Sequence, residues 1–109
     1  MKSRTPARLD LRSQALKRQI AAVLRANPDL LQIGVDNLER WRYPDGTWGR
    51  HTPYMEEWMR AIQRGVEECC RLLEDTTEAT QALRTAAPFA GVLSEVERRK
   101  FLADWEATS

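Results

Sequence analysis

The side chains that most often carry out chemistry in proteins are few in this sequence and far apart. His51 is the single histidine, and Cys69 and Cys70 are the two cysteines. A structural zinc site needs about four such ligands, usually in spaced pairs. We therefore interpret His51 as an exposed loop residue, and we predict neither a metal site nor a cofactor.

The two cysteines are neighbours on a helical pattern. Their side chains then point about 100° apart, so a disulfide between them is geometrically implausible. We expect Cys69 to be a small core residue and Cys70 to lie at the edge of the core. Two unpaired thiols fit a reducing compartment.

Pairs of carboxylates are the other candidates for acid or base chemistry. Glu56 with Glu57, and Glu67 with Glu68, fall on the polar side of one helical pattern, so we interpret them as surface residues. The chain also lacks the glycine-rich phosphate-binding motifs and the G-x-S-x-G motif of many hydrolases. We predict no catalytic residues and no enzymatic activity.

The segments that position these side chains all show helical spacing, with apolar residues recurring at three- and four-residue steps. Capping boxes are indicated at Asp75 to Glu78 and at Ser94 to Glu97. We predict helices over about 9–26, 28–42, 53–74, 76–86 and 94–107, with a turn-rich loop at about 43–52 that contains a tight Asp45-Gly46 turn. The expected fold is all-α, a compact bundle of four to five helices in one domain over residues 1–109, with residues 1–8 as a flexible basic arm.

Charge is distributed unevenly along the chain. Residues 1–26 contain seven Lys and Arg but only one Asp and no Glu. The remainder of the chain contains ten Lys and Arg and fifteen Asp and Glu. Such a basic segment is typical of contacts with nucleic acid or with an acidic partner. The candidate nucleic-acid contacts are Arg4, Arg8, Arg12, Lys17, Arg18 and Arg25. The long loop before residue 53 does not fit a helix-turn-helix.

Neither a membrane span nor a secretory signal is indicated. No apolar run approaches the roughly 18 to 20 residues that cross a bilayer. The basic start of the chain lacks the apolar stretch and cleavage site of a signal peptide. We expect a cytoplasmic protein.

Aromatic residues gather around the predicted loop, where they favour either core packing or recognition. We expect Trp41 and Trp58 to close the core, and Trp48, between Thr47 and Gly49, to be the most exposed anchor. The candidate partner-binding residues in this region are Trp48, Tyr43 and Tyr54.

A short apolar stretch, A-P-F-A-G-V-L at residues 87–93, separates the last two predicted helices. We call it the plug. Pro88 and Gly91 interrupt regular structure, so its bulky side chains either enter the core or face a partner. Both alternatives stay open, and the plug adds three candidate partner-binding residues: Phe89, Val92 and Leu93.

The C-terminal third resembles a group of small bacterial helical proteins. The similarity lies in A-P-F-A-G-V-L-S-E-V-E-R, preceded by E-D-T-T-E-A-T-Q-A-L-R, and upstream in A-N-P-D-L-L, N-L-E-R-W and Y-M-E-E-W, together about residues 13–102. Members read S-P-F-A-G-V-L, so Ala87 replaces an expected serine, and the P-D-G-T-W-G loop is a further departure. The resemblance implies no catalytic activity and suggests the smaller partner of a toxin-antitoxin gene pair.

Three functional hypotheses follow. The first is an antitoxin-like, non-catalytic protein that docks on a cognate, toxin-like protein and restrains it. The second is a nucleic-acid-binding regulator that uses the basic N-terminal helix. The third is a homodimeric structural protein.

Overall fold

The computed structural model describes residues 6–108 of the chain and the side chains of residues 10–107. This part of the chain forms helices and connecting segments without a strand, which confirms the all-α prediction. It contains six α-helices, more than the four to five expected: α1 (Pro6–Ala26), α2 (Leu31–Trp41), α3 (Thr52–Arg64), α4 (Val66–Glu74), α5 (Gln81–Thr85) and α6 (Glu95–Thr108). Three short 3-10 helices join them: η1 (Pro28–Leu30), η2 (Gly49–His51) and η3 (Glu78–Thr80).

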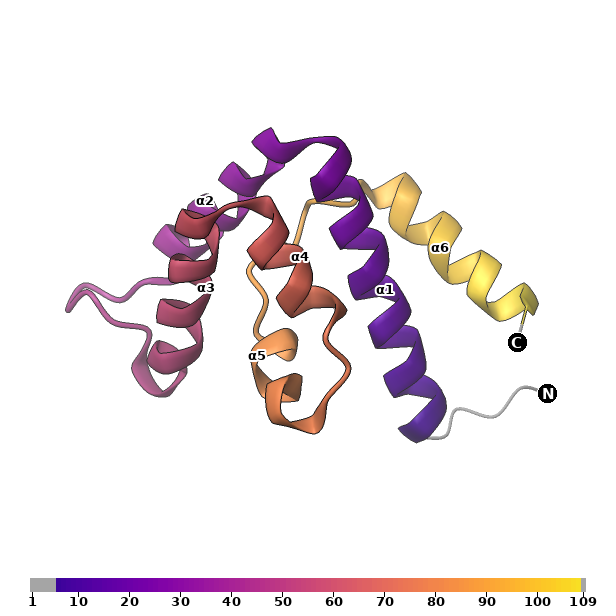
Figure 1. Ribbon diagram of the computed structural model, residues 1–109, viewed down its shortest axis with the longest axis horizontal. Helices are drawn as coiled ribbons and strands as arrows, with labels where there is room; N and C mark the ends of the chain where they lie inside the picture. Colours follow the sequence, from indigo (N-terminus) through magenta and orange to yellow (C-terminus); the bar gives the residue numbers. More distant parts are fainter. Residues whose placement is uncertain (1–5, 109) are drawn as a thin grey trace.

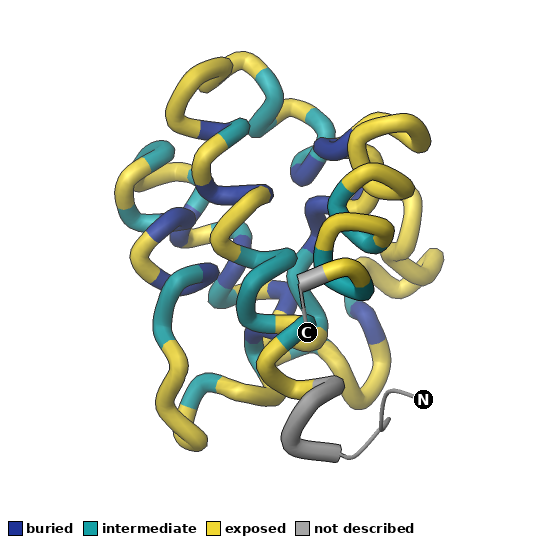
Figure 2. The backbone as a smooth tube through the Cα atoms, turned by 90° about the vertical axis from the view of Figure 1, so that its right-hand side faces the viewer, coloured by how far each residue is buried: buried dark blue, intermediate teal, exposed yellow. Residues whose placement is uncertain are grey.

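The helices form an arch (Figure 1). One side is made by α2 and α3 with the loop between them, α4 and α5 lie in the middle, and α1 and α6 form the other side. Buried positions gather where the helices face one another, and exposed positions point outward (Figure 2). The principal extents are 48 × 29 × 23 Å. None of the described helices is long and apolar enough to cross a membrane.

Helix α1 begins at Pro6, three residues before the expected start at Leu9. The predicted flexible arm covers residues 1–8, of which residues 1–5 lie outside the described part. The boundary after α1 agrees with prediction, because α1 ends at Ala26 and the 3-10 turn η1 starts at Pro28. Asn27 supplies no side-chain cap there, and its amide donates back to the carbonyl of Val23.

The expected long helix over 53–74 is divided in two at Gly65. This glycine has φ 114°, in the region that favours residues without a Cβ. Its amide donates to the carbonyls of Ala61 and Ile62, at 3.1 Å each, which closes α3 before α4 starts at Val66. The prediction of one continuous helix was therefore wrong, because apolar spacing continues through the break.

The two expected capping boxes have different outcomes. At Ser94 the box is present: the amide of Ser94 donates to Glu97 Oε1 at 3.0 Å, and the amide of Glu97 donates to Ser94 Oγ at 3.1 Å. At Asp75 the carboxylate instead accepts from the amide of Thr77, at 2.8 Å, which forms a local turn. The helix expected over 76–86 is consequently the 3-10 turn η3 followed by the short α5.

The most extensive packing joins α1 to α4. Leu24 and Ala21 of α1 are fully buried, as are Cys69 and Cys70 of α4. Cys70 therefore belongs to the core rather than to its edge, and its thiol lies 3.4 Å from the carbonyl oxygen of Ala21. Burial raises the pKa of Cys69 to about 12, so this thiol stays protonated at neutral pH.

The plug is part of the core. Phe89, Val92 and Leu93 are 2%, 5% and 9% exposed, so they are not available to a partner in this structure. The Phe89 ring meets the Trp58 ring edge to face, with centroids 5.4 Å apart. It also lies over Gly34, where a Cβ would approach Phe89 Cε1 to 2.7 Å. Gly34 thus allows close approach both of the plug ring and of Ile62 on the neighbouring helix α3, 3.2 Å from that Cβ position.

Candidate protein-binding site

The loop after α2 is a folded element rather than a loose connection. The amide of Gly46 donates to the Tyr43 carbonyl at 2.9 Å, and the amide of Tyr43 donates to the Thr47 carbonyl at 2.8 Å. Asp45 Oδ1 accepts from the amide and the hydroxyl of Thr47, and these hydrogen bonds lower the pKa of Asp45. The predicted turn-rich loop is present, but its tight turn is centred on Pro44 and Asp45 rather than on Asp45 and Gly46. The turn fixes the position of Tyr43.

Trp48 anchors this loop from the inside. It is 6% exposed, and its indole Nε1 donates to the carbonyl of Leu38 at 2.8 Å. The guanidinium of Arg42 lies 4.5 Å from the centre of the Trp48 ring, a cation–π contact. The expectation that Trp48 is the most exposed aromatic residue was wrong. A buried indole N–H that donates to a carbonyl keeps a hydrogen bond in place of the one it made to water.

Other aromatic residues near the loop are exposed. Trp58 is fully buried, as expected, whereas Trp41 is 40% exposed and does not close the core. Tyr43 and Tyr54 are 57% and 37% exposed. Trp41, Tyr43 and Tyr54 are therefore the aromatic side chains of this region that are accessible to solvent.

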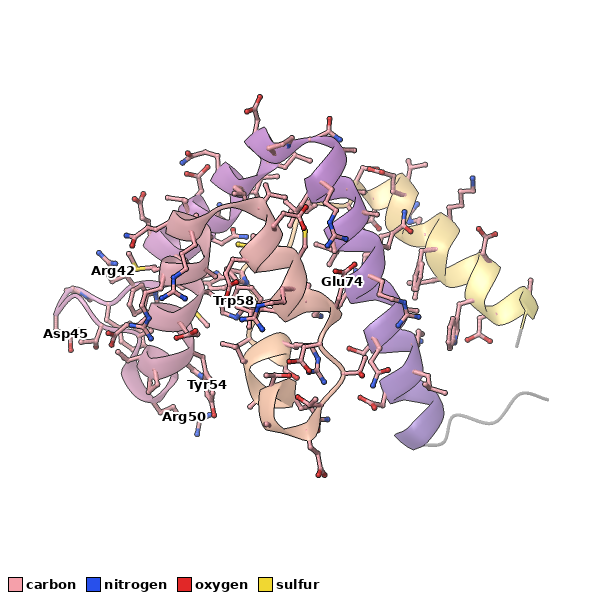
Figure 3. All side chains as sticks on the ribbon, viewed as in Figure 1. Arg42, Asp45, Arg50, Tyr54, Trp58 and Glu74 are labelled. Atoms are coloured by element: carbon pink, nitrogen blue, oxygen red, sulfur yellow. The ribbon has the colours of Figure 1, made fainter. Side chains whose placement is uncertain are left out.

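These exposed rings line one wall of an open groove of about 1200 Å³. We call it the aromatic groove. Its second wall is formed by η3, α5 and the segment after α5, where four alanines alternate with polar residues: Glu78, Ala79, Gln81, Ala82, Thr85, Ala86 and Ala87. Tyr54 and Arg50 lie at the N-terminal end of α3 (Figure 3), and Tyr54 lines the aromatic groove. Met55 and Trp48 contribute to the buried floor.

The alanine wall was not predicted as a surface. The spacing of Ala79, Ala82 and Ala86 suggested a thin inward face that allows a close approach. In the structure Ala79 and Ala82 are exposed, and Ala86 is partly buried. The small side chains leave space that the bulky residues of α2 and α3 do not fill.

The candidate acid, base and metal residues stay apart from one another. His51 is exposed, as expected, and lies at the rim of the aromatic groove. Glu57 pairs with Arg60, and Glu68 pairs with Arg71, each at 2.6 Å. Among the described residues no group of three or more His, Cys, Asp or Glu side chains is arranged to hold a metal ion.

The basic residues of the N-terminal segment do not form one free patch. Arg4 lies outside the described residues, as does the side chain of Arg8. Arg12 is partly buried and Arg18 is exposed. Lys17 is partly buried near Arg84, and Arg25 is paired with two carboxylates. Arg18 and the partly buried Arg12 remain for a nucleic-acid contact in the described part of α1.

Arg25 ties α1 to α4. Its guanidinium donates to both oxygens of Glu74, at 2.7 and 2.8 Å, and its Nε donates to Glu67 at 3.1 Å. Hydrogen bonding to Arg25 lowers the pKa of Glu74. The partners lie 42 and 49 residues along the chain, so sequence periodicity gives no sign of this pairing.

We expect Arg25→Gln to reduce the free energy of unfolding by at most about 1 kcal/mol, because the pairs are exposed to water and salt. A carboxylate with a lowered pKa stabilises the fold above its ordinary pKa, and this contribution disappears as the pH falls. Urea unfolding at pH 7 and pH 3 checks both statements. The difference between wild type and variant should shrink at pH 3, and a loss well above 1 kcal/mol at pH 7 would contradict the assignment.

Comparison of the chain with protein-family models, curated proteins and solved structures finds no match.

Proposed function

We propose that this protein is a non-catalytic binding protein that docks on a cognate protein and restrains it, in the manner of an antitoxin. The aromatic groove is the observation that carries the proposal. Three exposed aromatic rings line an open groove of about 1200 Å³, whose opposite wall carries four alanines together with Glu78, Gln81 and Thr85. Aromatic side chains over a buried floor are typical of the residues that dominate protein interfaces.

The shape of the groove favours an amphipathic helix of the partner as its occupant. Small side chains at Ala79 and Ala82 allow a helix backbone to come close, while Trp41 and Tyr54 offer wide apolar surfaces to its side chains. The exposed Arg50 beside Tyr54 makes no ion pair within the described part of the chain. An acidic residue at the edge of the apolar face of the partner helix would complement that charge.

Nucleic-acid regulation is the alternative, with a homodimeric structural protein as a third hypothesis. The ion pairs of Arg25 and the partial burial of Lys17 leave fewer free cations on α1 than the sequence suggested. The reduced number of free cations on α1 therefore favours the first hypothesis over the second.

The test begins with capture of the tagged protein from an extract of its native cells, with and without nuclease, followed by reconstitution of any stoichiometric partner from purified components. We expect Ala82→Arg, which fills the aromatic groove, to weaken the reconstituted complex by roughly 30-fold or more. Tyr54→Ala should act in the same direction.

Ala22→Arg is the matched control, because Ala22 is an exposed helical alanine of α1 that does not line the aromatic groove. It should bind the partner as wild type does. Equal loss of affinity in Ala22→Arg and Ala82→Arg, or no loss in either, would overturn the groove as the docking site. Recovery of nucleic acid alone would favour the regulator.

A further inference from the structure

A second, smaller depression lies on the other side of α5. In Figure 1, α5 stands between α3 and α1, and the aromatic groove occupies the α3 side. The depression on the α1 side has a volume of about 290 Å³ and is lined by polar side chains, among them Gln14, Lys17, Gln81 and Arg84. We call it the cationic pocket.

Arg84 is the most deeply placed group of the cationic pocket, with only 6% of its surface exposed. Its Nη1 donates to the carbonyl of Thr77 at 3.0 Å and to the hydroxyl of Thr80. The same Nη1 lies 3.9 Å from Asp75 Oδ1. These contacts hold one end of the guanidinium and leave Nε and Nη2 without an acceptor in the described part of the chain.

The unpaired donors of Arg84 are not sealed inside the protein, and Arg84 lines the cationic pocket. Every fully enclosed side-chain nitrogen or oxygen of the described residues has a hydrogen-bond partner. Nε and Nη2 of Arg84 have none, so they are not fully enclosed, and Arg84 lines the cationic pocket. A planar guanidinium with two free donor positions matches the two oxygens of a carboxylate or phosphate group.

Lys17 supplies a second cation to the same space. Its ammonium makes no hydrogen bond or ion pair with the described residues. The pKa of Lys17 is lowered because burial removes water from the ammonium and because Arg84 is near. Two positive groups therefore line the same partly buried space, where their repulsion is less screened than in open water.

Two carboxylates lie nearby, and Asp75 partly compensates the charge of Arg84 through an ion pair at its Nη1 end. Asp75 touches Arg84 only from the Nη1 end, accepts from the amide of Thr77, and does not line the cationic pocket. Asp10 does line it, but its Oδ2 accepts from the side-chain amide of Gln14 at 3.0 Å. Asp10 is also exposed, which weakens its field at Lys17.

We propose that the cationic pocket is a binding site for a single oxyanion, a carboxylate or phosphate group held between Lys17 and the free donors of Arg84. The hydroxyls of Ser13 and Thr85 line the same space and can donate to further oxygens. Binding relieves the repulsion between the two cations and satisfies the unpaired guanidinium donors at once. The site stands independently of the proposed docking function.

The place of this site suggests how a larger ligand would reach it. Gln81 and Thr85 line both the cationic pocket and the aromatic groove. A polypeptide segment that crosses α5 would therefore place apolar side chains on one side and an acidic or phosphorylated side chain on the other.

The test needs no partner. Acetate and, separately, inorganic phosphate replace chloride at constant ionic strength, and the backbone amide signals of Lys17 and Thr85 are followed by NMR. We expect saturable shifts with at least one of the two ions. A response to acetate indicates a carboxylate ligand, and a response to phosphate alone indicates a phosphorylated ligand.

Lys17→Gln should raise the dissociation constant about tenfold, and Asp10→Asn should lower it, because the latter removes a competing negative charge. Arg18→Gln, a change of an exposed cation on the same helix, should leave the constant unchanged. The proposal fails if neither ion gives shifts beyond those of chloride, if Lys17→Gln responds as wild type, or if Arg18→Gln weakens binding equally.

Discussion

Phe89→Ala should lower the free energy of unfolding by about 3–5 kcal/mol, the range for removal of a buried aromatic ring. Phe89 is 2% exposed and contacts the Trp58 ring at a centroid distance of 5.4 Å, and an alanine leaves that space empty. A domain of this size has a total stability of roughly 5–15 kcal/mol. The variant therefore stands near the limit of folding.

Urea unfolding followed by tryptophan fluorescence measures this loss, and Phe89→Leu provides a milder variant with an expected loss of roughly 1–2 kcal/mol. Val96→Ala is the control, because Val96 is 76% exposed and should change stability by less than about 0.5 kcal/mol. Equal effects of Phe89→Ala and Val96→Ala would contradict the placement of the plug in the core.

Gly34 allows a sharper version of the same experiment. A methyl group at Gly34 would lie 2.7 Å from Phe89 Cε1 and 3.2 Å from Ile62 Cδ1, so Gly34→Ala should be destabilising in the wild-type background. Once Phe89 is alanine, the methyl group enters the vacated space, and the helix gains about 1 kcal/mol from the better propensity of alanine. The two changes should therefore be coupled by more than about 1 kcal/mol, and simple additivity would show that the ring lies elsewhere.

The parts of the fold that sequence predicted well are those decided by neighbours along the chain. The Ser94 to Glu97 capping box depends on two side chains three residues apart and on the backbone between them, and both hydrogen bonds are present. The end of α1 before Pro28 is similarly local. Gly65 was missed although its signal is local, because the apolar periodicity on both sides indicated one helix.

The candidate site was harder to predict because burial of a loop side chain depends on distant partners. Trp48 is buried because its indole reaches the Leu38 carbonyl, which belongs to another element, whereas Trp41 at the end of α2 faces the opening beside α5. No periodicity distinguishes these two residues in the sequence. Tyr43 and Tyr54 are exposed in the structure, and their role in binding stays a prediction.

For the basic N-terminal segment, too, the sequence alone did not show which charged residues stay free in the fold. Counting charges along residues 1–26 suggested a patch, but Arg25 finds Glu67 and Glu74 across the α1 and α4 interface. Lys17 of α1 and Arg84 of α5 line the same cationic pocket. A charge count identifies which residues are available, whereas the fold decides whether each one meets solvent, a counter-ion or another cation.

Asn37 carries the second large effect that we expect, because one side-chain amide holds the plug at two points. Its Nδ2 donates to the Pro88 carbonyl at 2.9 Å and to the Ala90 carbonyl at 3.0 Å, and the residue is only 4% exposed. Leucine has a similar volume but no donor. Asn37→Leu should therefore leave both carbonyls without their partner and lower the free energy of unfolding by about 2–4 kcal/mol.

The matched control for this variant is Gln32→Leu on the same helix. The Gln32 amide donates to Asp36 at 2.9 Å on the exposed side of α2, so its loss should lower the free energy of unfolding by less than about 0.5 kcal/mol.

Amide hydrogen exchange adds a local readout, because the Val92 amide donates to the Phe89 carbonyl at 3.1 Å within the plug. In Asn37→Leu the exchange of Val92 should accelerate more than that of α4 amides, since the plug loses its anchor while the α1 and α4 core keeps its contacts. Uniform acceleration across the chain would instead mean that Asn37 serves global stability alone, and unchanged stability would show that the two carbonyls find other donors.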